Sequence, residues 1–319
     1  MENKKNIIAR AVIYFLVFFL LSSLLYAVFQ KKTPKTQDVV QPPSALEKTE
    51  SPAPATVETK LKVGTKLKLP SPASLVQGAN NIERSDRATP IPTIGISYPS
   101  QVFNLTNWKL TLPIGLLESP AEIKQPELGT YKIDPWFIVA PDGGVRFRAP
   151  VNGVTTSGSN YPRSELREMT NNGQEKASWS SNSGTHTLFL DQAITAVPKK
   201  KKHVVAGQIH DKKDDVIVIR LQYPDLYVNV DGKNVYKLDS SYALGKRFTV
   251  QFQVIGNQTK VYYNNSADAV HTLNKDYSGA YFKTGAYTQS NCSKEGFFSP
   301  CNDNNYGEVV VYQVIVTHQ

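Results

Sequence analysis

A chain of 319 residues is long enough for one large β domain or two average domains, so length alone does not decide between them. The formal net charge is +9 at pH 7, but residues 1–100 carry 13 basic and 7 acidic side chains, whereas residues 101–319 carry 23 and 20. Because most of the excess lies in the first third of the chain, the overall charge does not by itself indicate a polyanion-binding surface on the remainder.

An uncharged apolar segment lies close to the N-terminus. Residues 11–29 are 19 uncharged positions in a row, and basic residues flank both ends. This length is sufficient to cross a bilayer and is long for the apolar part of a signal peptide. Leu25 and Ala27 form a poor cleavage site, so we interpret residues 1–30 as an uncleaved anchor, with a cleaved signal peptide as the alternative. In either case we expect an exported protein, membrane-anchored at the cell envelope or secreted.

Residues 31–97 are typical of a disordered linker. They are rich in Pro, Thr, Ser, Lys and Ala, and they have no apolar periodicity. The alternating segment LKVGTKLKL, residues 61–69, could form a short strand, but no neighbouring segment would pair with it. We therefore interpret it as a basic part of the linker, which leads into a folded domain at 98–319.

The remaining chain consists of short alternating runs separated by turn residues. FTVQFQVI, residues 248–255, has Phe or Val at every second position, and the runs on either side of Asp231 and Gly232 predict a hairpin. Further strands are expected at 216–222, 259–264 and 308–318. Only residues 119–128 have a pattern that suggests a helix, and Pro126 would limit the length of that helix. This pattern favours a single all-β domain, an antiparallel sandwich or jelly roll.

The segment YPRSELREM, residues 161–169, carries three alternating charges. A strand has a side-chain period of two, so Arg163, Glu165 and Arg167 fall on one face, while Ser164 and Leu166 fall on the other. A ladder of salt bridges with no catalytic part is the simplest structural explanation. The alternative is a face that binds an anionic ligand.

Two more segments have a polar face of this kind. In HVVAGQIH, residues 203–210, the period aligns Gln208 with His210 and turns Val205 and Ile209 to the other side. In YFKTGAYTQ it aligns Tyr281, Lys283, Tyr287 and Gln289. Any antiparallel sheet with one solvated face alternates in this way. These residue types, however, are those of a site that binds carboxylates and transfers protons, so we interpret the faces as functional.

Four sequence blocks resemble the alginate lyases of polysaccharide lyase family 7. They are FNLTNWKLTLP at 103–113, RSELR at 163–167, QIH at 208–210 and YFKTGAYTQ at 281–289, and in the family's order they cover essentially all of 101–319. The resemblance implies a concanavalin A-like β-jelly roll whose concave sheet forms a groove for alginate or a related polyuronate. It implies four catalytic residues: Arg163, Gln208, His210 and Tyr287. It also implies sugar-binding or supporting roles for Glu165, Arg167, Lys283 and Gln289, and Tyr281 could stack on a sugar.

The chemistry of such a site follows from the acidity of its substrate. A uronate polymer is cut without water when the C5 proton is removed and the C4 oxygen is expelled. Arg163, Gln208 and His210 can donate hydrogen bonds to the sugar carboxylate and stabilise the enolate-like intermediate. Tyr287 is the expected donor to the leaving oxygen. Either Tyr287 or His210 can be the base, with His210 suited to guluronate.

Two other functions remain open at this stage. A glycoside hydrolase needs two facing carboxylic groups, but the polar faces offer only Glu165. A non-catalytic carbohydrate-binding module would need neither His210 nor Tyr287.

Relatives with Ile in the middle of the QIH motif tend to act on guluronate, so Ile209 favours a preference for guluronate-containing blocks. We expect a monomer that needs no cofactor and no metal and does not bind nucleic acid, because no stacking module with interleaved basic residues is recognisable.

The remaining candidates are mostly structural. Cys292 and Cys301 lie in one loop of an exported chain and are expected to form a disulfide. The run Lys199–Lys202 is interpreted as a solvated loop, with the edge of a polyanion-binding groove as the alternative. The other histidines lack metal-ligand spacing, and the tryptophans are expected in the core. These residues are His186, His203, His271, His318, Trp108, Trp136 and Trp179.

Overall fold

The computed structural model describes residues 95–319. The predicted apolar anchor, nearly all of the predicted linker and the possible strand at 61–69 lie outside the described residues. Within residues 95–319, no helix has the length and apolar character needed to cross a membrane.

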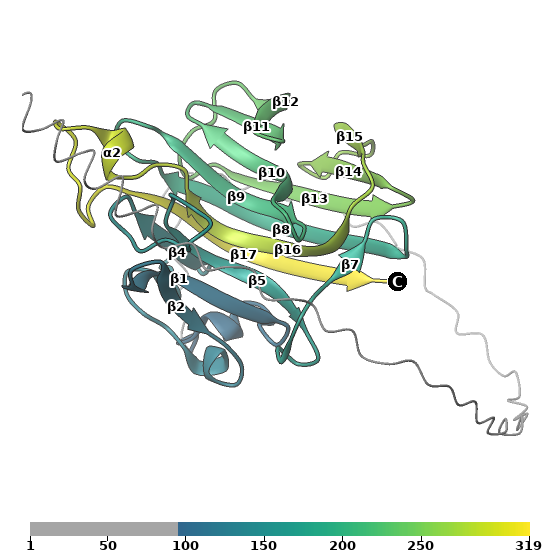
Figure 1. The fold of residues 1–319 in the computed structure, drawn as a ribbon, viewed down its shortest axis with the longest axis horizontal. Helices are drawn as coiled ribbons and strands as arrows, with labels where there is room; N and C mark the ends of the chain where they lie inside the picture. Colours follow the sequence, from purple (N-terminus) through teal and green to yellow (C-terminus); the bar gives the residue numbers. More distant parts are fainter. Residues whose placement is uncertain (1–94) are drawn as a thin grey trace, which may run out of the picture. The chain divides into compact units, whose positions relative to one another are not determined.

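Two antiparallel sheets make up the domain, and their strands overlie one another in Figure 1. The larger sheet has the order β12 (Lys233–Asp239), β11 (Asp225–Val230), β10 (Asp215–Gln222), β9 (His203–His210), β16 (Ser278–Thr288), β5 (Arg163–Thr170), β1 (Trp108–Leu116) and β2 (Ser119–Ile123). In the same sheet, β6 (Glu175–Lys176) pairs with β5 and β7 (Trp179–Ser180) pairs with β16. We call it the groove sheet.

The second sheet has seven strands and packs against the groove sheet. Its order is β15 (His271–Asn274), β14 (Gln258–Tyr263), β13 (Arg247–Ile255), β8 (Thr185–Ala196), β17 (Tyr306–His318), β4 (Val145–Pro150) and β3 (Phe137–Val139). Three helical turns complete the domain: η1 (Pro99–Gln101), η2 (Glu127–Thr130) and α2 (Cys292–Glu295). The predicted all-β antiparallel sandwich is confirmed.

Local sequence patterns account for most of these elements. Buried residues alternate along β13 as the FTVQFQVI pattern predicts. The hairpin between β11 and β12 turns at Asp231 and Gly232, whose φ values of 48° and 76° suit the left-handed region that such a turn requires. The suggested helix at 119–128 is wrong, because residues 119–123 form strand β2 against β1 and only Glu127–Thr130 turns, as η2.

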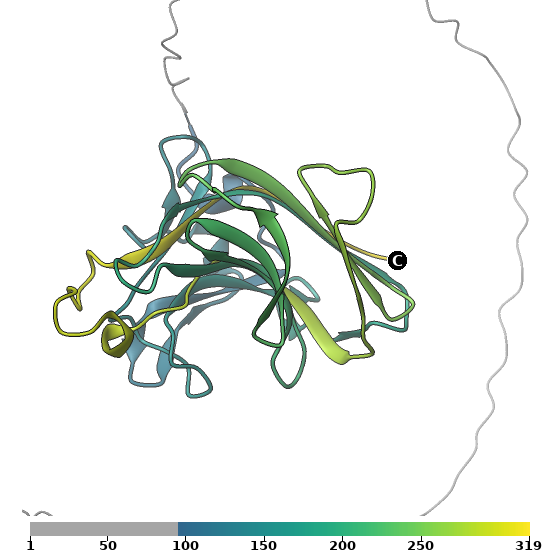
Figure 2. The ribbon, with the colours of Figure 1, turned by 90° about the horizontal axis from the view of Figure 1, so that it is seen from above.

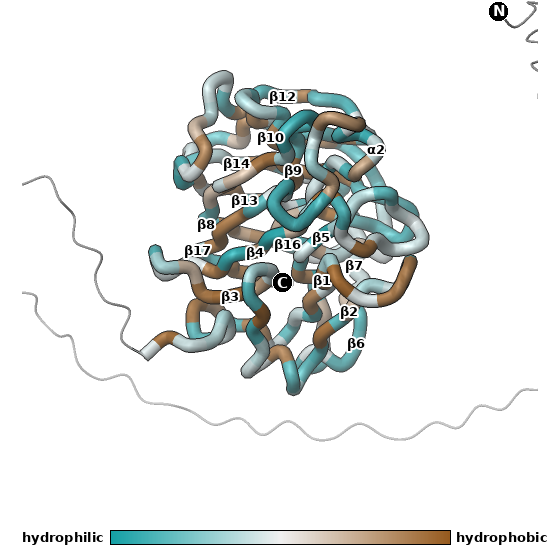
Figure 3. Tube along the Cα trace, turned by 90° about the vertical axis from the view of Figure 1, so that its left-hand side faces the viewer, coloured by the Kyte–Doolittle hydropathy of each residue, from teal (hydrophilic) through white to brown (hydrophobic). Residues whose placement is uncertain are grey.

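The core lies between the two sheets. Figure 2 shows the sheets as stacked, curved layers, and Figure 3 shows apolar stretches along their strands with mostly hydrophilic loops around them. Four fully buried phenylalanines come from both layers: Phe137, Phe147, Phe252 and Phe282. Burying a side chain of this size stabilises the fold by about 1.5–3 kcal/mol. Trp108 and Trp136 are also buried, whereas Trp179 is only partly buried.

A disulfide closes the loop around α2. Cys292 and Cys301 are joined, as predicted, with their Cα atoms 5.0 Å apart. Inside this loop the carboxylate of Glu295, only 1% exposed, accepts hydrogen bonds from the backbone N–H groups of Lys200 and Lys201 at 2.9 and 3.0 Å. Burial alone would raise the pKa of Glu295, but hydrogen bonds from Asn305, Ser290 and these two N–H groups outweigh it and lower the pKa to about 2.

The low pKa of Glu295 predicts a loss of stability in acid. Its ordinary value is 4.5, so ionised Glu295 contributes about 3 kcal/mol to the unfolding free energy above about pH 4.5. This contribution disappears as the pH falls toward about 2. We expect Glu295→Gln to be less stable than the wild type at pH 7 in urea unfolding, with a smaller difference at pH 3. A difference that does not change with pH would contradict this role.

Candidate active site

The exposed face of the groove sheet contains a cleft of about 400 Å³. Three adjacent strands, β5, β16 and β9, form its centre. Where β16 pairs with β5, Tyr287 lies opposite Arg163 and Lys283 lies opposite Arg167. Where β16 pairs with β9, Lys283 lies opposite Gln208. The cleft is lined by all four residues that were predicted to be catalytic: Arg163, Gln208, His210 and Tyr287. Side chains from segments more than 100 positions apart therefore converge on one site.

The residues that were predicted to bind sugar are distributed unevenly around this cleft. Arg167, Tyr281 and Lys283 line it. Glu165 lies beneath the surface at 1% exposure. Gln289 does not line the cleft, and its side-chain oxygen accepts a hydrogen bond from Arg220 at 3.2 Å.

Glu165 is the electrostatic centre of the site. Its carboxylate accepts a hydrogen bond from Gln208, forms an ion pair with Lys283 and lies 3.4 Å from an Arg163 nitrogen. Burial alone would raise the pKa of Glu165, but Lys283 and Arg163 outweigh burial and hold that pKa below its usual value. Burial, reinforced by the charge of Arg163, lowers the pKa of Lys283 to about 8 despite Glu165. At neutral pH Glu165 is therefore ionised, and basic side chains outnumber acidic ones among the residues that line the cleft.

Arg163 has donors available for a ligand. Its guanidinium stacks over the Tyr287 ring at 3.9 Å from the centroid, and its only hydrogen bond among residues 95–319 is the long one to Glu165. The buried Nε has no partner within the same residues. Arg167 differs, because it donates to the carbonyl oxygens of Glu168 and Ala177 and stacks on Tyr281. Arg163 is therefore the better placed of the two to bind a carboxylate.

The geometry of His210 defines its tautomer. Nδ1 lies 2.7 Å from the carbonyl oxygen of Asp211, which can only accept, so Nδ1 carries a hydrogen. Burial is the largest cause that lowers the pKa of His210, and the charge of Lys283 acts in the same direction. A neutral His210 therefore presents the lone pair of Nε2. Its ring stacks on Tyr281, with centroids 5.2 Å apart, which holds the imidazole in place.

Tyr287 lies between positive charge and a second hydroxyl. Its phenol oxygen is 2.9 Å from Ser159 Oγ, and the Lys283 ammonium is 5.9 Å from its ring centroid. The ring of Tyr161 meets the Tyr287 ring edge-on, with centroids 6.4 Å apart. Arg163 and Lys283 can therefore stabilise negative charge that develops on the phenol oxygen.

The predicted orientation of Val205 on β9 is wrong. Val205 was expected to point away from Gln208 and His210, but it pairs with Tyr287 on one side and Arg220 on the other, and so lies on the cleft side. Gly207, with a φ of 144°, adds an extra residue to the strand at this point. A bulge of one residue exchanges the two faces beyond it. Ile209 lies on the same side of the bulge as Gln208 and His210, and it faces the core as predicted.

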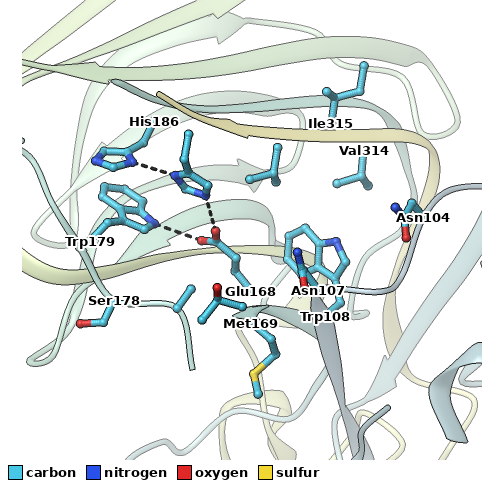
Figure 4. A pocket seen from close by; sticks show the side chains of 14 residues that line it. Asn104, Asn107, Trp108, Glu168, Met169, Ser178, Trp179, His186, Val314 and Ile315 are labelled. Carbon is cyan, nitrogen blue, oxygen red and sulfur yellow. Dashed lines mark hydrogen bonds and ion pairs between the residues drawn. The ribbon is translucent and has the colours of Figure 1, made fainter. Parts of the chain in front are cut away.

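A separate cavity of about 570 Å³, shown in Figure 4, lies beside the end of β17. Here Glu168 accepts hydrogen bonds from the Trp179 indole at 3.1 Å and the Phe282 backbone N–H at 2.8 Å. His318 Nε2 lies 2.6 Å from the other Glu168 oxygen, and the Nδ1 atoms of His318 and His186 are 2.7 Å apart. These contacts join β5, β7, β8, β16 and β17. No sequence motif indicated this cluster, because its members are distant in the chain.

We expect Glu168 to be important for stability. Its carboxylate is 3% exposed, so Glu168→Ala would leave three donors without their acceptor. The unfolding free energy should fall by about 2–6 kcal/mol, because the Trp179 and Phe282 N–H groups lose their acceptor at about 1–3 kcal/mol each. Glu175→Ala, at an exposed position, is the control and should change it by less than about 0.5 kcal/mol. Equal stability of the two variants in urea unfolding would contradict the assignment.

The part of the chain that the structure describes contains no cluster of three or more His, Cys, Asp or Glu side chains suited to a metal ion.

Comparisons with known proteins point to one family. A family model described as alginate lyase matches residues 103–318. An alginate lyase structure from Corynebacterium sp. is 51% identical, covers 70% of this chain and 99% of its own, and has a TM-score of 0.67. AlgAT5, an alginate lyase from polysaccharide lyase family 7, is 52% identical with the same coverage and a TM-score of 0.65. An alginate lyase from Klebsiella pneumoniae is 25% identical over 69% of this chain and 91% of its own length.

Proposed function

This chain belongs to the alginate lyases of polysaccharide lyase family 7 and is a polysaccharide lyase that acts on alginate, and from this premise we propose how it does so. It cleaves the polymer by β-elimination, with a preference for guluronate-containing blocks, and leaves a C4–C5 unsaturated uronate at each new non-reducing end. The observation that supports this most is the convergence of Arg163, Gln208, His210 and Tyr287 around one cleft.

Neutralising the sugar carboxylate is the first requirement of this reaction. Removing the C5 proton places negative charge next to an ionised carboxylate, and donors aimed at that group lower the barrier. Arg163 has a buried Nε without a partner in the described domain, and the Gln208 amide has a second N–H beyond the one bound to Glu165. Glu165 stays ionised and holds Arg163, Lys283 and Gln208 in position.

Proton transfer completes the elimination. A base takes the C5 proton, the C5–H electron pair becomes the C4–C5 double bond, and the bond between C4 and the glycosidic oxygen breaks. Tyr287 donates its phenolic proton to that oxygen. Arg163 at its ring and Lys283 nearby stabilise the phenolate that remains. Ser159, 2.9 Å from the phenol oxygen, orients the hydroxyl.

The base depends on which side of the sugar ring carries the proton. Where the C5 proton and the leaving oxygen lie on one side, Tyr287 begins as the phenolate, takes the C5 proton and passes it to the leaving oxygen, so it ends in its starting state. Where they lie on opposite sides, as in guluronate, neutral His210 accepts the proton at Nε2 and later releases it to water. The side chain of Ile209 is buried in the core between Gln208 and His210. It therefore acts on block preference through the positions of its two neighbours.

The proposed place of action is outside the cytoplasm. The uncharged segment at 11–29 supports an exported enzyme, and the linker at 31–97 would let an anchored domain reach a polymer away from the membrane. Detection of the chain in the membrane fraction or in the medium would support export, and its retention in the cytoplasm would contradict it.

The experiment that tests the function compares purified polyguluronate, polymannuronate and mixed polymer as substrates. We expect the ultraviolet absorbance of the conjugated double bond to rise fastest with guluronate-containing material, and chromatography to give the product sizes. Reducing ends that form without this absorbance would contradict β-elimination. Equal rates on all three polymers would contradict the block preference. A His210→Gln variant with full activity on polyguluronate would exclude His210 as the base.

A further inference from the structure

The basic run at 199–202 forms a surface that the proposed reaction does not use. Lys200, Lys201, Lys202 and Lys294, which we call the lysine wall, line a depression of about 390 Å³ together with His203 and Tyr223. The run precedes β9, and Lys294 belongs to α2, which lies with the loop that follows it at one end of the sandwich in Figure 1. Four ammonium groups are thus gathered at one side of the groove sheet.

A buried carboxylate holds the lysine wall in shape. Glu295 binds the backbone N–H groups of Lys200 and Lys201, and Asn305 Oδ1 accepts from the Lys199 backbone N–H at 2.9 Å. Glu295, which lies inside the loop closed by the disulfide, is itself fixed by hydrogen bonds with Ser290, Ser299 and Asn305. A purely solvated loop does not require such anchoring. The backbone of the run is therefore ordered before any ligand arrives, which lowers the entropy cost of binding.

The positive charge of the lysine wall is not neutralised within the domain. None of its four lysines forms an ion pair with a carboxylate of residues 95–319. Burial, with the charges of Lys201 and Arg220, lowers the pKa of His203 to about 4, so this histidine is neutral at pH 7. The surface thus presents four cations and no anion, and an anionic ligand is complementary to it.

The lysine wall is continuous with the cleft. Lys201 Nζ donates to the Tyr161 hydroxyl at 2.9 Å, and the Tyr161 ring packs edge-on against Tyr287. On the floor of the groove sheet, Tyr287 pairs with Val205 of β9, and Val205 pairs with Arg220 of β10. Two strand spacings, about 10 Å, therefore separate Tyr287 from Arg220. The buried Nε of Arg220 has no partner within the described domain.

From this arrangement we propose that Arg220 and the lysine wall form an accessory site for carboxylates of the polyuronate chain, where it extends from Tyr287 across β9 and β10. This inference rests on the proposed function, because it assumes that the chain being cut lies in the cleft. The site binds parts of the polymer that do not react. It therefore increases affinity for long chains and does not change the chemical step.

A matched pair of full-length double variants tests the proposal. Lys200→Ala/Lys202→Ala removes two charges from the lysine wall, and Lys132→Ala/Lys260→Ala removes two charges elsewhere. We expect the wall variant to have a KM for long polyuronate about three- to tenfold above wild type, because each exposed pair contributes modestly. Its kcat should be unchanged, its KM for a short oligouronate should stay within about twofold, and its KM should depend less on salt.

Binding without turnover separates this inference from the proposed function. In gels that contain polyuronate, the wild type and the control should be retarded and the wall variant less so. Retardation that depends on the wall, without cleavage by the wild type, would overturn the function and support the site. Normal cleavage with equal behaviour of both double variants would overturn the site alone. So would an equal rise in KM for long and short substrates, or retardation by inorganic polyphosphate but not by polyuronate.

Discussion

Tyr287→Phe is expected to lower kcat on alginate by about 100- to 10,000-fold, the usual range for loss of a general acid or base. The substitution removes one hydroxyl, whose hydrogen-bond partner is Ser159. The phenyl ring can still stack under Arg163 and against Tyr161. The leaving oxygen would then have no proton donor, and on substrates where Tyr287 is also the base, both transfers would fail. Initial rates from the ultraviolet absorbance of the product measure the effect.

Tyr161→Phe is the matched control for this prediction. It also removes a hydroxyl from a tyrosine next to the cleft, but that hydroxyl accepts from Lys201 rather than facing the scissile bond. We expect kcat to stay within about threefold of wild type, since this partly buried hydrogen bond involves no group that reacts. Tyr287→Phe with normal turnover would remove Tyr287 from both proposed roles.

Glu165→Gln should reduce both activity and stability. The substitution leaves the Lys283 ammonium buried without its counter-ion, and breaking a buried pair in this way costs about 3–5 kcal/mol of unfolding free energy. Burial already lowers the pKa of Lys283 to about 8, and loss of the Glu165 charge would lower it further. Without its anchor Arg163 would no longer be held toward the substrate carboxylate, and kcat should fall by about 100- to 1000-fold.

A second variant separates the two effects of Glu165. In Glu165→Gln/Lys283→Met both members of the buried pair are neutral, so we expect urea unfolding to recover most of the lost stability. The activity should remain low, because Arg163 still lacks the carboxylate that positions it. Recovery of kcat together with stability would show that Glu165 acts only through the fold. A Glu165→Gln enzyme with wild-type stability would contradict the ion-pair assignment.

Regular alternation made the central strands predictable from sequence. Arg163, Glu165 and Arg167 share a face because β5 has no irregularity against β1 or β16. Tyr281, Lys283 and Tyr287 also share a face, because β16 pairs regularly with β5, although its register against β9 shifts between Lys283 and Tyr287. The error at Val205 arose at the Gly207 bulge, and a glycine inside a strand pattern could have been a warning of it.

Contacts between distant segments could not be predicted in this way. Gln289 continues the polar face of β16, yet its partner is Arg220, from a strand that only the sheet order brings near. The cluster of Glu168, His186 and His318 likewise joins three strands that no local pattern relates. The disulfide was predictable, because Cys292 and Cys301 are the two cysteines of the sequence and lie only nine positions apart.

The most direct test of the account is the mass balance of cleavage. Alginate oligomers of defined length are incubated with the wild-type enzyme, and the masses of the products are measured by mass spectrometry. Elimination by the Arg163, Gln208, His210 and Tyr287 site predicts that the fragment masses add up to the mass of the substrate, with every new non-reducing end unsaturated. If the summed mass of the fragments exceeded the mass of the substrate by one water molecule for each bond cleaved, this would show hydrolysis and contradict the account.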